Sequence, residues 1–477
     1  MFLSKSVAKR EMPDFQRCIP WRPFCPTINH KHFHLLGTSF FYVNLASRAI
    51  LPANAPAEGP PDLERFPIAP EPPQHRTTER SIITIRPSVA TLSSLPSDFN
   101  EFLGNTRAVE SLRTAIAAGR LPHSLILAGP AGAGKYTLAL MLALAVECER
   151  QPRDLWSNGQ SLASFCGHCQ NCTRIASAAN LEEQVAAAVL VREELRETDK
   201  KETRVLIQPH PDVLILPPDP PQLLIKLGQV RTLIQRAHYL PAEAPRRIFI
   251  LTSANMMKEA ANSLLKILEE PPDSVHILIL AENPGELLPT IRSRCATIRL
   301  GALPVEEIEM MLADRRPDVP PKQRALIARL SQGAAGRALA FDLETFTAAR
   351  TDALIFLQNA APALKNATEA DPDHTALFKM TETYRAGADG QQKTTALLRA
   401  FSLLLEDLLL LDAGTPELLR NIDLRPELDR LAQSLPFAWI EMASRAVDQV
   451  HSGLRRNLLR SLSLDAFAAQ LTPVGAP

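Results

Sequence analysis

The most constraining feature of this sequence is a glycine-rich loop between a short aliphatic run and an apolar helical stretch. The aliphatic run is Leu125–Ala128, the loop reads Gly129-Pro-Ala-Gly-Ala-Gly134-Lys135, and the helical stretch is Leu138–Val146. Glycines let backbone N–H groups close around phosphate oxygens, the helix N-terminus favours anions, and the lysine would reach the β- and γ-phosphates. The order of strand, loop and helix therefore predicts a phosphate-binding loop. The residues assigned to it are Gly129, Gly134, Lys135 and Thr137.

The loop belongs to an alternating pattern of aliphatic runs and helix-length connections. The chain has 477 residues, 45% hydrophobic and 22% charged, so it has an ordinary globular composition and is long enough for several hydrophobic cores. Short continuous aliphatic runs joined by helices are typical of a parallel sheet with both faces covered, and the predicted fold class is therefore α/β. The runs are Leu125–Ala128, Val213–Leu216, Ile248–Leu251, Ile277–Leu280 and Ile298–Leu300.

Two positions that organise magnesium in phosphate-loop ATPases carry unsuitable residues here. Tyr136 directly follows Lys135, where a Ser or Thr hydroxyl would coordinate the metal, and its bulky ring cannot replace that group. The run Ile248–Leu251 is followed by Thr252 instead of an acidic residue that would hold the metal. The sequence therefore predicts a vestigial nucleotide site, with weak or absent ATP binding and no ATP hydrolysis by the chain itself.

Two further strings of residues carry a family resemblance. The first is Asn262-Ser-Leu-Leu-Lys266-Ile-Leu-Glu269-Glu-Pro-Pro272, on a helix with one apolar face, and the second is Ser293-Arg294-Cys295. Together with the phosphate loop, they resemble the sliding-clamp loaders of the AAA+ class in bacterial DNA polymerase III holoenzymes. The resemblance extends from residue 99 to 345 and more faintly to the C-terminus. Shorter matching segments are Phe102-Leu-Gly104, Leu121-Pro-His123 and His210-Pro-Asp-Val213.

Within that family, the resemblance implies a non-hydrolysing stator subunit of the loader that places the sliding clamp on primed DNA. Arg294, with Ser293 and Cys295 beside it, would act as an arginine finger for the ATP of a neighbouring subunit. The implied partners are the gamma/tau motor subunits, the delta subunit, the sliding clamp and, through the assembled complex, primed DNA. The alternative role for Arg294 is a structural arginine that pairs with a local carboxylate.

Two positions depart from the pattern of an ATP-competent loader. Glu282 stands where a polar sensor is expected, and its carboxylate would repel phosphate. In Gly333-Ala-Ala-Gly336-Arg337, the second-sensor arginine is displaced by one residue. A motor subunit of the gamma/tau type that hydrolyses ATP is an alternative function, against which these departures argue. A zinc-dependent nucleic-acid adaptor without nucleotide coupling is another, and it would leave Arg294 without a role.

Four of the seven cysteines are candidates for a structural zinc site. Cys166, Cys169 and Cys172 are spaced by two residues, and Cys148 at the end of the phosphate-loop helix could supply a fourth thiolate. With equal numbers of basic and acidic residues, 52 each, and no secretion signal, the chain is expected in a reducing cytoplasm, where such a cluster binds metal. The family resemblance implies a zinc module at the same place.

The other ligand sets and cysteines are weaker candidates. No further cysteine follows at a ferredoxin-like interval, which argues against an iron–sulfur cluster. His168 could replace one thiolate, although its position between two ligands favours a solvent-facing role. Cys295 is expected to be a small buried hydrophobe, and Cys18 and Cys25 lie in an N-terminal extension.

The chain is expected to comprise four regions. Residues 1–95 are rich in proline and are expected to be unstructured, as a targeting segment or the product of an upstream start site, with neither secretion nor a membrane span. Residues 96–301 form the nucleotide-binding-like domain, with the zinc module at 148–172 and a solvated charged helix near 180–205. The resemblance implies a helical lid at 302–345 and a helical collar at 346–477. The apolar run Leu403–Leu411 is expected to be buried either within the collar or against another subunit.

Overall fold

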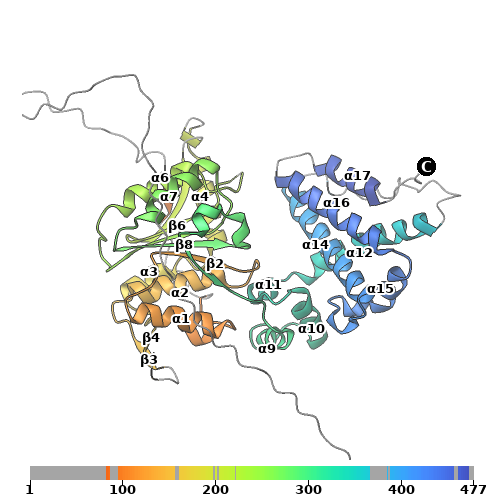
Figure 1. The fold of residues 1–477 in the computed structure, drawn as a ribbon, viewed down its shortest axis with the longest axis horizontal. Helices are drawn as coiled ribbons and strands as arrows, with labels where there is room; N and C mark the ends of the chain where they lie inside the picture. Colours follow the sequence, from red (N-terminus) through yellow and green to blue (C-terminus); the bar gives the residue numbers. More distant parts are fainter. Residues whose placement is uncertain are drawn as a thin grey trace, which may run out of the picture. The chain divides into compact units, whose positions relative to one another are not determined.

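The computed structural model describes most of the chain after residue 95 (Figure 1). The described residues are 82–85, 95–155, 159, 161–196, 199–200, 203–220, 222–365, 384, 387–455 and 460–471. Cys18, Cys25 and most of the N-terminal extension lie outside them, so the statements made about those residues stay sequence-based expectations.

The central element is a sheet of seven strands in the order β1-β5-β6-β7-β8-β2-β9. Neighbouring strands are parallel except β5 and β6, which are antiparallel. The five aliphatic runs of the sequence form β2, β6, β7, β8 and β9, as predicted, and the mostly parallel sheet confirms the α/β fold class. The strands are β1 (Ile82–Ile85), β2 (Ser124–Ala128), β5 (Arg204–His210), β6 (Val213–Leu216), β7 (Arg247–Leu251), β8 (Val275–Ala281) and β9 (Ala296–Arg299).

Strand β1 lies in the extension for which the sequence predicted no regular structure, and that prediction is wrong for these four residues. Ile82–Ile85 pair in parallel register with Arg204–Ile207 of β5. Isoleucine and threonine favour extended backbone, and the otherwise open side of β5 supplies the pairing partner. Strand β5 was also not anticipated, because it follows directly on the charged stretch.

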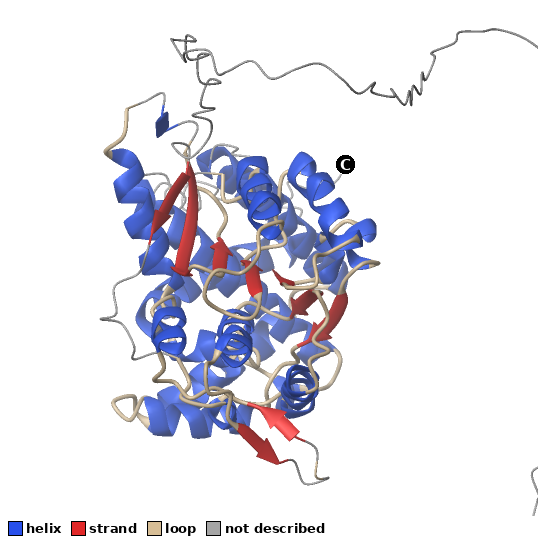
Figure 2. Cartoon of the chain, turned by 90° about the vertical axis from the view of Figure 1, so that its left-hand side faces the viewer, coloured by secondary structure: helices blue, strands red, loops and turns tan. Residues whose placement is uncertain are grey.

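The two faces of the sheet are covered by different helices (Figure 2). Leu125 and Leu127 pack in one hydrophobic cluster with α1 (Thr106–Ala117), α2 (Lys135–Glu147) and α3 (Gln170–Ala176). Their neighbours Ile126 and Ala128 point to the opposite face, which α6 (Leu227–Ala237) and α7 (Lys258–Glu269) cover. This alternation follows from the two-residue period of a strand. Burial on both faces explains the apolar character of the central strands β2, β6, β7 and β8.

A small hairpin and a charged helix complete this part of the chain. Strands β3 (Arg153–Leu155) and β4 (Ser161–Ala163) are antiparallel, and Arg113 of α1 attaches them by an ion pair with Asp154 and a 2.9 Å hydrogen bond to the Ala163 carbonyl. Helix α4 (Leu181–Glu193) occupies the start of the charged stretch and buries only Gln184 and Ala188. It therefore has the largely solvated character expected for this segment.

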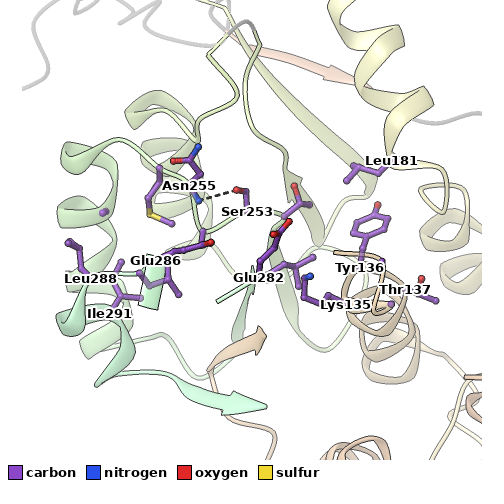
Figure 3. Close-up of a pocket in the computed structure, with 18 of the residues that line it drawn as sticks. Lys135, Tyr136, Thr137, Leu181, Ser253, Asn255, Glu282, Glu286, Leu288 and Ile291 are labelled. Carbon is purple, nitrogen blue, oxygen red and sulfur yellow. Dashed lines mark hydrogen bonds between the residues drawn. The ribbon is translucent and has the colours of Figure 1, made fainter. Parts of the chain in front are cut away.

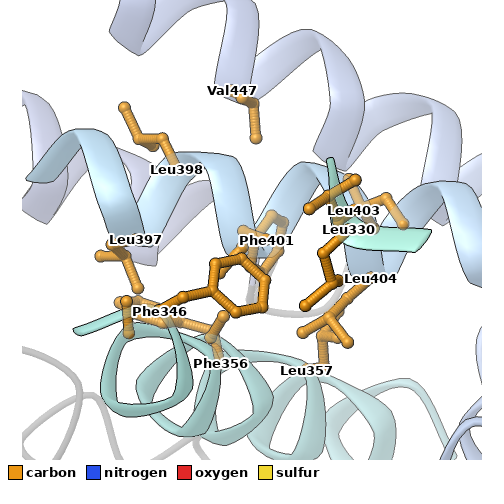
Figure 4. Packing of buried hydrophobic residues seen from close by; sticks show 14 of the residues in the cluster. Leu330, Phe346, Phe356, Leu357, Leu397, Leu398, Phe401, Leu403, Leu404 and Val447 are labelled. Atoms are coloured by element: carbon orange, nitrogen blue, oxygen red, sulfur yellow. The ribbon is translucent and has the colours of Figure 1, made fainter. Parts of the chain in front are cut away.

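The remainder of the described chain is helical. One hydrophobic cluster extends from Ile308 to Leu471, so the expected lid and collar regions share a core. Phe356, Phe401 and Phe467 contact one another within it, with ring centroids 5.1 to 6.3 Å apart. Figure 4 shows Phe356 and Phe401 among the leucines of this cluster. The helices are α9 (Val305–Arg315), α10 (Pro321–Leu330), α11 (Ala335–Leu339), α12 (Leu343–Lys365), α14 (Gly387–Asp412), α15 (Arg425–Ala432), α16 (Phe437–Arg455) and α17 (Arg460–Leu471).

The apolar run of α14 is buried by this core. Leu403, Leu404 and Leu408 are almost inaccessible to solvent and belong to the same cluster as α12 and α16. The structure therefore accounts for the run by packing within the chain, the first of the two expected explanations. None of the described helices combines the length and apolar character needed to cross a membrane.

Candidate functional site: a phosphate loop, an exposed arginine and a cysteine cluster

The phosphate loop lines a pocket of about 820 Å³ at the carboxyl end of the sheet (Figure 3). Other walls come from Thr252–Met256, which follow β7, and from Glu282, which follows β8. Glu286, Leu287, Leu288 and Ile291 also line it. Because β2, β7 and β8 are parallel, their carboxyl ends open at the same edge. Ligands of α/β sheets bind in such a crevice.

Lys135 is directed back into its own loop. Its Nζ donates hydrogen bonds to the carbonyl oxygens of Gly129 at 2.6 Å and Pro130 at 2.8 Å. Burial lowers the pKa of Lys135, and the nearby Glu282 carboxylate acts in the opposite direction. Glu282 therefore acts on Lys135 as a counter-charge inside the pocket.

The two positions at which the sequence analysis expected magnesium ligands carry Tyr136 and Thr252. The Tyr136 hydroxyl donates a 2.7 Å hydrogen bond to the Ala178 carbonyl, and burial raises its pKa. Thr252 follows β7, and among the described residues its buried hydroxyl has no hydrogen-bond partner. Neither side chain is a carboxylate that could hold a divalent cation.

The glycines of the loop accommodate close neighbours. A Cβ on Gly129 would lie 2.7 Å from the Leu300 carbonyl, and one on Gly134 would lie 3.0 Å from the Phe102 ring. The Gly336 N–H at the start of α11 donates to the Gly132 carbonyl at 2.8 Å. Thr137, which follows Tyr136 in α2, lines the same pocket. The region expected to be a lid therefore contacts the loop through backbone atoms.

Arg337 contacts the loop with its backbone and the neighbouring helices with its side chain. A Cβ on Gly132 would lie 2.7 Å from the Arg337 backbone nitrogen. The Arg337 guanidinium donates to the side-chain oxygen of Gln332 at 2.9 Å and to the Ser331 carbonyl at 3.4 Å. The hydrogen bonds of the Arg337 side chain are therefore made within its own helical region.

Arg294 lies at the surface between the end of α8 (Pro289–Arg292) and β9. Its Nε donates to Glu269 Oε1 at 2.8 Å, and its Nη2 reaches the same carboxylate oxygen. Nη1 donates to the Thr290 carbonyl at 2.9 Å and to Ser293 Oγ at 3.2 Å. Arg294 is therefore paired with a local carboxylate, as the alternative role of a structural arginine requires. However, 33% of its side chain is exposed.

Cys295 has a different character from its two neighbours. Ser293 and Arg294 are exposed, whereas Cys295 is half-buried against the cluster under α6 and α7. Burial raises the pKa of its thiol to about 11. Cys295 is therefore a packing residue, as expected from the sequence.

The four predicted zinc ligands converge. The Sγ atoms of Cys148, Cys166, Cys169 and Cys172 all lie within 4.8 Å of one another. Backbone N–H groups donate to three of these sulfurs: Cys166 N to Cys148 Sγ at 3.3 Å, Cys169 N to Cys166 Sγ at 3.3 Å, and Cys172 N to Cys169 Sγ at 3.5 Å. Such donors stabilise thiolate charge, and four thiolates suit a closed tetrahedral zinc site. The donor set and its spacing fit zinc.

Burial and hydrogen bonds pull the thiol pKa values apart. Burial raises the pKa of Cys148 and of Cys172. At Cys166, burial also acts upward, but the N–H groups of His168 and Cys169 outweigh it and lower the pKa to about 6. His168 itself is exposed, and its ring nitrogens face the Cys166 carbonyl at 2.6 Å and Arg150 at 2.8 Å. It is not part of the sulfur cluster.

A polar connection between the cysteine cluster and the sheet was missed by sequence reasoning. Asn171, between two of the cysteines, donates to the Glu147 carbonyl at 2.9 Å, and its side-chain oxygen lies 3.1 Å from His210 Nε2. The Asp212 N–H donates to His210 Nδ1 at 3.1 Å. The sequence feature that could have pointed to this connection is the His210-Pro-Asp segment, which was recognised only as part of the family resemblance.

The comparisons with known proteins find similarity to subunits of DNA polymerase III. Residues 104–304 match the family model described as DNA polymerase III, delta subunit. The chain is 30% identical over 230 residues to DNA polymerase III subunit delta' of Bacillus subtilis, covering 48% of this chain and 56% of that relative. Similarity to subunit delta' of Pseudomonas aeruginosa is 30% over 213 residues, covering 44% of this chain and 53% of the relative.

A motor-type relative matches over a similar length. DNA polymerase III subunit tau of Escherichia coli is 27% identical over 249 residues, covering 51% of this chain and 32% of the relative. The chain thus spans between a third and just over half of the length of these relatives. Over residues 104–304, within the part of the chain that forms the mostly parallel sheet, this chain is therefore similar to subunits of DNA polymerase III.

Proposed function

We propose that this chain is the delta'-type stator of a DNA polymerase III clamp loader, a subunit that does not hydrolyse ATP and offers Arg294 to ATP on a neighbouring motor subunit. The main support is the contrast between two sites on one domain. Tyr136, in place of a magnesium-binding hydroxyl, uses its oxygen on the Ala178 carbonyl. Arg294 meanwhile lies exposed beside β9.

The remaining parts of the proposal follow from the same family. Residues 302–345 would act as the lid and 346–477 as the collar that joins loader subunits. The partners would be the gamma/tau motor subunits, the delta subunit and the sliding clamp, with primed DNA bound through the assembled complex in the cytoplasm. Cys148, Cys166, Cys169 and Cys172 would hold a structural Zn²⁺, since their sulfurs already converge.

The competing function is a motor subunit of the gamma/tau type. The similarity to E. coli tau, over a segment as long as that matched by delta', favours it. It requires a hydrolytic site, whereas the Tyr136 hydroxyl is engaged by the Ala178 carbonyl and Thr252 stands where an acidic metal ligand is expected. The two functions therefore differ in whether this chain turns over ATP itself.

The decisive test for the proposal is an Arg294→Ala loader, reconstituted with the motor and delta subunits of the same organism. A trans-acting arginine stabilises charge on the transferred phosphoryl group at one site, so with three independent motor sites roughly a third of the DNA-stimulated ATP turnover should be lost. Arg294→Lys keeps the charge without the planar fork and should recover little. Unchanged ATP turnover and clamp loading in an intact Arg294→Ala complex would refute the trans-acting role.

A further inference from the structure

The contact between Glu269 and Arg294 joins the two motifs that carry the family resemblance. Glu269 is the last residue of α7, where Pro271 and Pro272 prevent the helix from continuing. Arg294 follows α8, and its Nε and Nη2 both donate to Glu269 Oε1. The helix dipole at the end of α7 also favours a cation there. The carboxylate is thus fixed at the place where it meets the guanidinium.

The guanidinium is almost fully occupied within its own chain. Arginine has five N–H groups. Glu269 takes Nε–H and one N–H of Nη2, while the Thr290 carbonyl and Ser293 Oγ take the two of Nη1. Among the described contacts, a single N–H of Nη2 is left. A phosphate held by both prongs of the arginine fork needs two, so one of these partners has to leave.

Glu269 is the partner that an incoming phosphate replaces most directly. Half of its side chain is exposed, and the pair is open to solvent, so it is a weak ion pair. A terminal phosphate carries more negative charge than a carboxylate and accepts from the same edge of the fork. The Thr290 carbonyl and Ser293 Oγ are neutral and do not compete with it in charge.

We propose that Glu269 is a positioning residue that holds Arg294 back until a neighbouring nucleotide displaces it. This inference rests on the proposed function of Arg294. With Glu269 in place, Arg294 is kept away from a phosphate by an ion pair whose disruption costs little free energy. The basal ATP turnover of the served site is therefore lower than it would be with a free arginine, and assembly on DNA overcomes the restraint.

The test uses Glu269→Gln in the reconstituted loader, with ATP turnover measured with and without primed DNA and clamp. The Arg294-dependent part of each rate is obtained by subtracting the rate of the Arg294→Ala loader. Because an exposed pair is weak, that part should rise about two- to fivefold without DNA and change less with DNA. In the Arg294→Ala background, Glu269→Gln should have no effect, since the two residues act as one unit.

Glu270→Gln is the matched control, because it removes the adjacent carboxylate, for which no contact with Arg294 is observed. It should leave the turnover unchanged, and both glutamine variants should unfold at the wild-type temperature. The inference is overturned if Glu269→Gln lowers or does not alter the Arg294-dependent rate, or if Glu270→Gln raises it equally. If Arg294→Ala alone has no effect, the proposed function fails first, which separates the two outcomes.

Discussion

At the scale of single residues, two side chains at the start of α2 are held by carbonyl groups of the chain itself. Lys135 donates to two carbonyls of its own loop, and Tyr136 donates to Ala178. Phosphate could still compete for the lysine, since those carbonyls are neutral. Catalysis needs a metal as well, and the pocket supplies no ligand for one at Tyr136 or Thr252.

The purified chain is accordingly predicted not to turn over ATP, and to bind it weakly if at all. Without a magnesium ion between the β- and γ-oxygens, the transition-state charge is not neutralised. The measurement is phosphate release by the chain alone, compared with Lys135→Ala. Residual release that survives Lys135→Ala comes from a contaminant, whereas release abolished by that substitution would show an active site and favour the motor function.

The sequence alone identified the residues that depart from an ATP-hydrolysing motif, but it did not identify the hydrogen-bond partners of these residues or of Arg294. Tyr136 and Thr252 were visible because motif positions are fixed by their distance along the chain from a loop or a strand. The Tyr136 partner is 42 residues away, and the Arg294 partner is 25 residues away. Such pairs are brought together only by the packing of helices and strands, so they cannot be predicted from a local sequence pattern.

At the scale of elements, the cysteine cluster joins segments that have little regular structure between them. Cys148 ends α2, Cys169 caps α3, and the β3–β4 hairpin lies between them in the sequence. The two strands of that hairpin have three residues each, too few to be stable alone. A metal that cross-links the ends of this segment would therefore contribute directly to its folding.

We predict that Cys169→Ala lowers both the zinc content and the thermal unfolding temperature of the protein. Loss of one of four thiolates opens the coordination sphere and removes the cross-link. Metal analysis of protein prepared under reducing, chelator-free conditions measures the first effect and a thermal melt the second. Cys295→Ala, outside the cluster, should retain the metal. Wild-type protein without metal under these conditions would contradict the assignment of zinc.

The same scale shows which elements were predictable. Strands β2, β6, β7 and β8 are buried on both faces, so each contains a run of at least four consecutive apolar residues that can be recognised in the sequence. Strand β5 contains Arg204, Gln208 and His210, and it pairs with β1 in a proline-rich extension. Strand β5 does not stand out by hydrophobicity, and hydrogen bonds such as that between His210 and Asn171 satisfy its buried polar groups. Strand β1 is apolar but only four residues long, and its partner β5 lies more than 100 residues away in the sequence.

At the scale of the whole molecule, backbone hydrogen bonds as well as the covalent chain connect the nucleotide-binding-like domain to the helices that follow it. Gly336 donates to the Gly132 carbonyl, and the Leu303 N–H donates to Gly333. Both contacts use backbone atoms, so they depend on glycine at positions where no side chain fits. The contact between the phosphate loop and α11 is accordingly close.

Gly132→Ala is predicted to destabilise the protein more than Gly119→Ala. Both glycines have positive φ, +79° and +63°, so both substitutions carry the left-handed backbone cost of about 1 to 2 kcal/mol. At Gly119 the new methyl group has nothing within 4 Å, whereas at Gly132 it would lie 2.7 Å from the Arg337 backbone. The expected excess is about 1 to 3 kcal/mol for overpacking, measured by denaturant unfolding. Equal losses would show that the loop and α11 separate freely.

The contact between Gly132 and Gly336 bears on how this sequence can change over time. Under the proposed function, ATP binding does not constrain the glycines of this loop, yet a Cβ on Gly132 would lie 2.7 Å from the Arg337 backbone nitrogen. Glycine at this position is therefore maintained by a requirement for fit, independently of any nucleotide. In proteins descended from this one, we therefore expect glycine at position 132 wherever α11 packs against the loop, whether or not the loop binds a nucleotide.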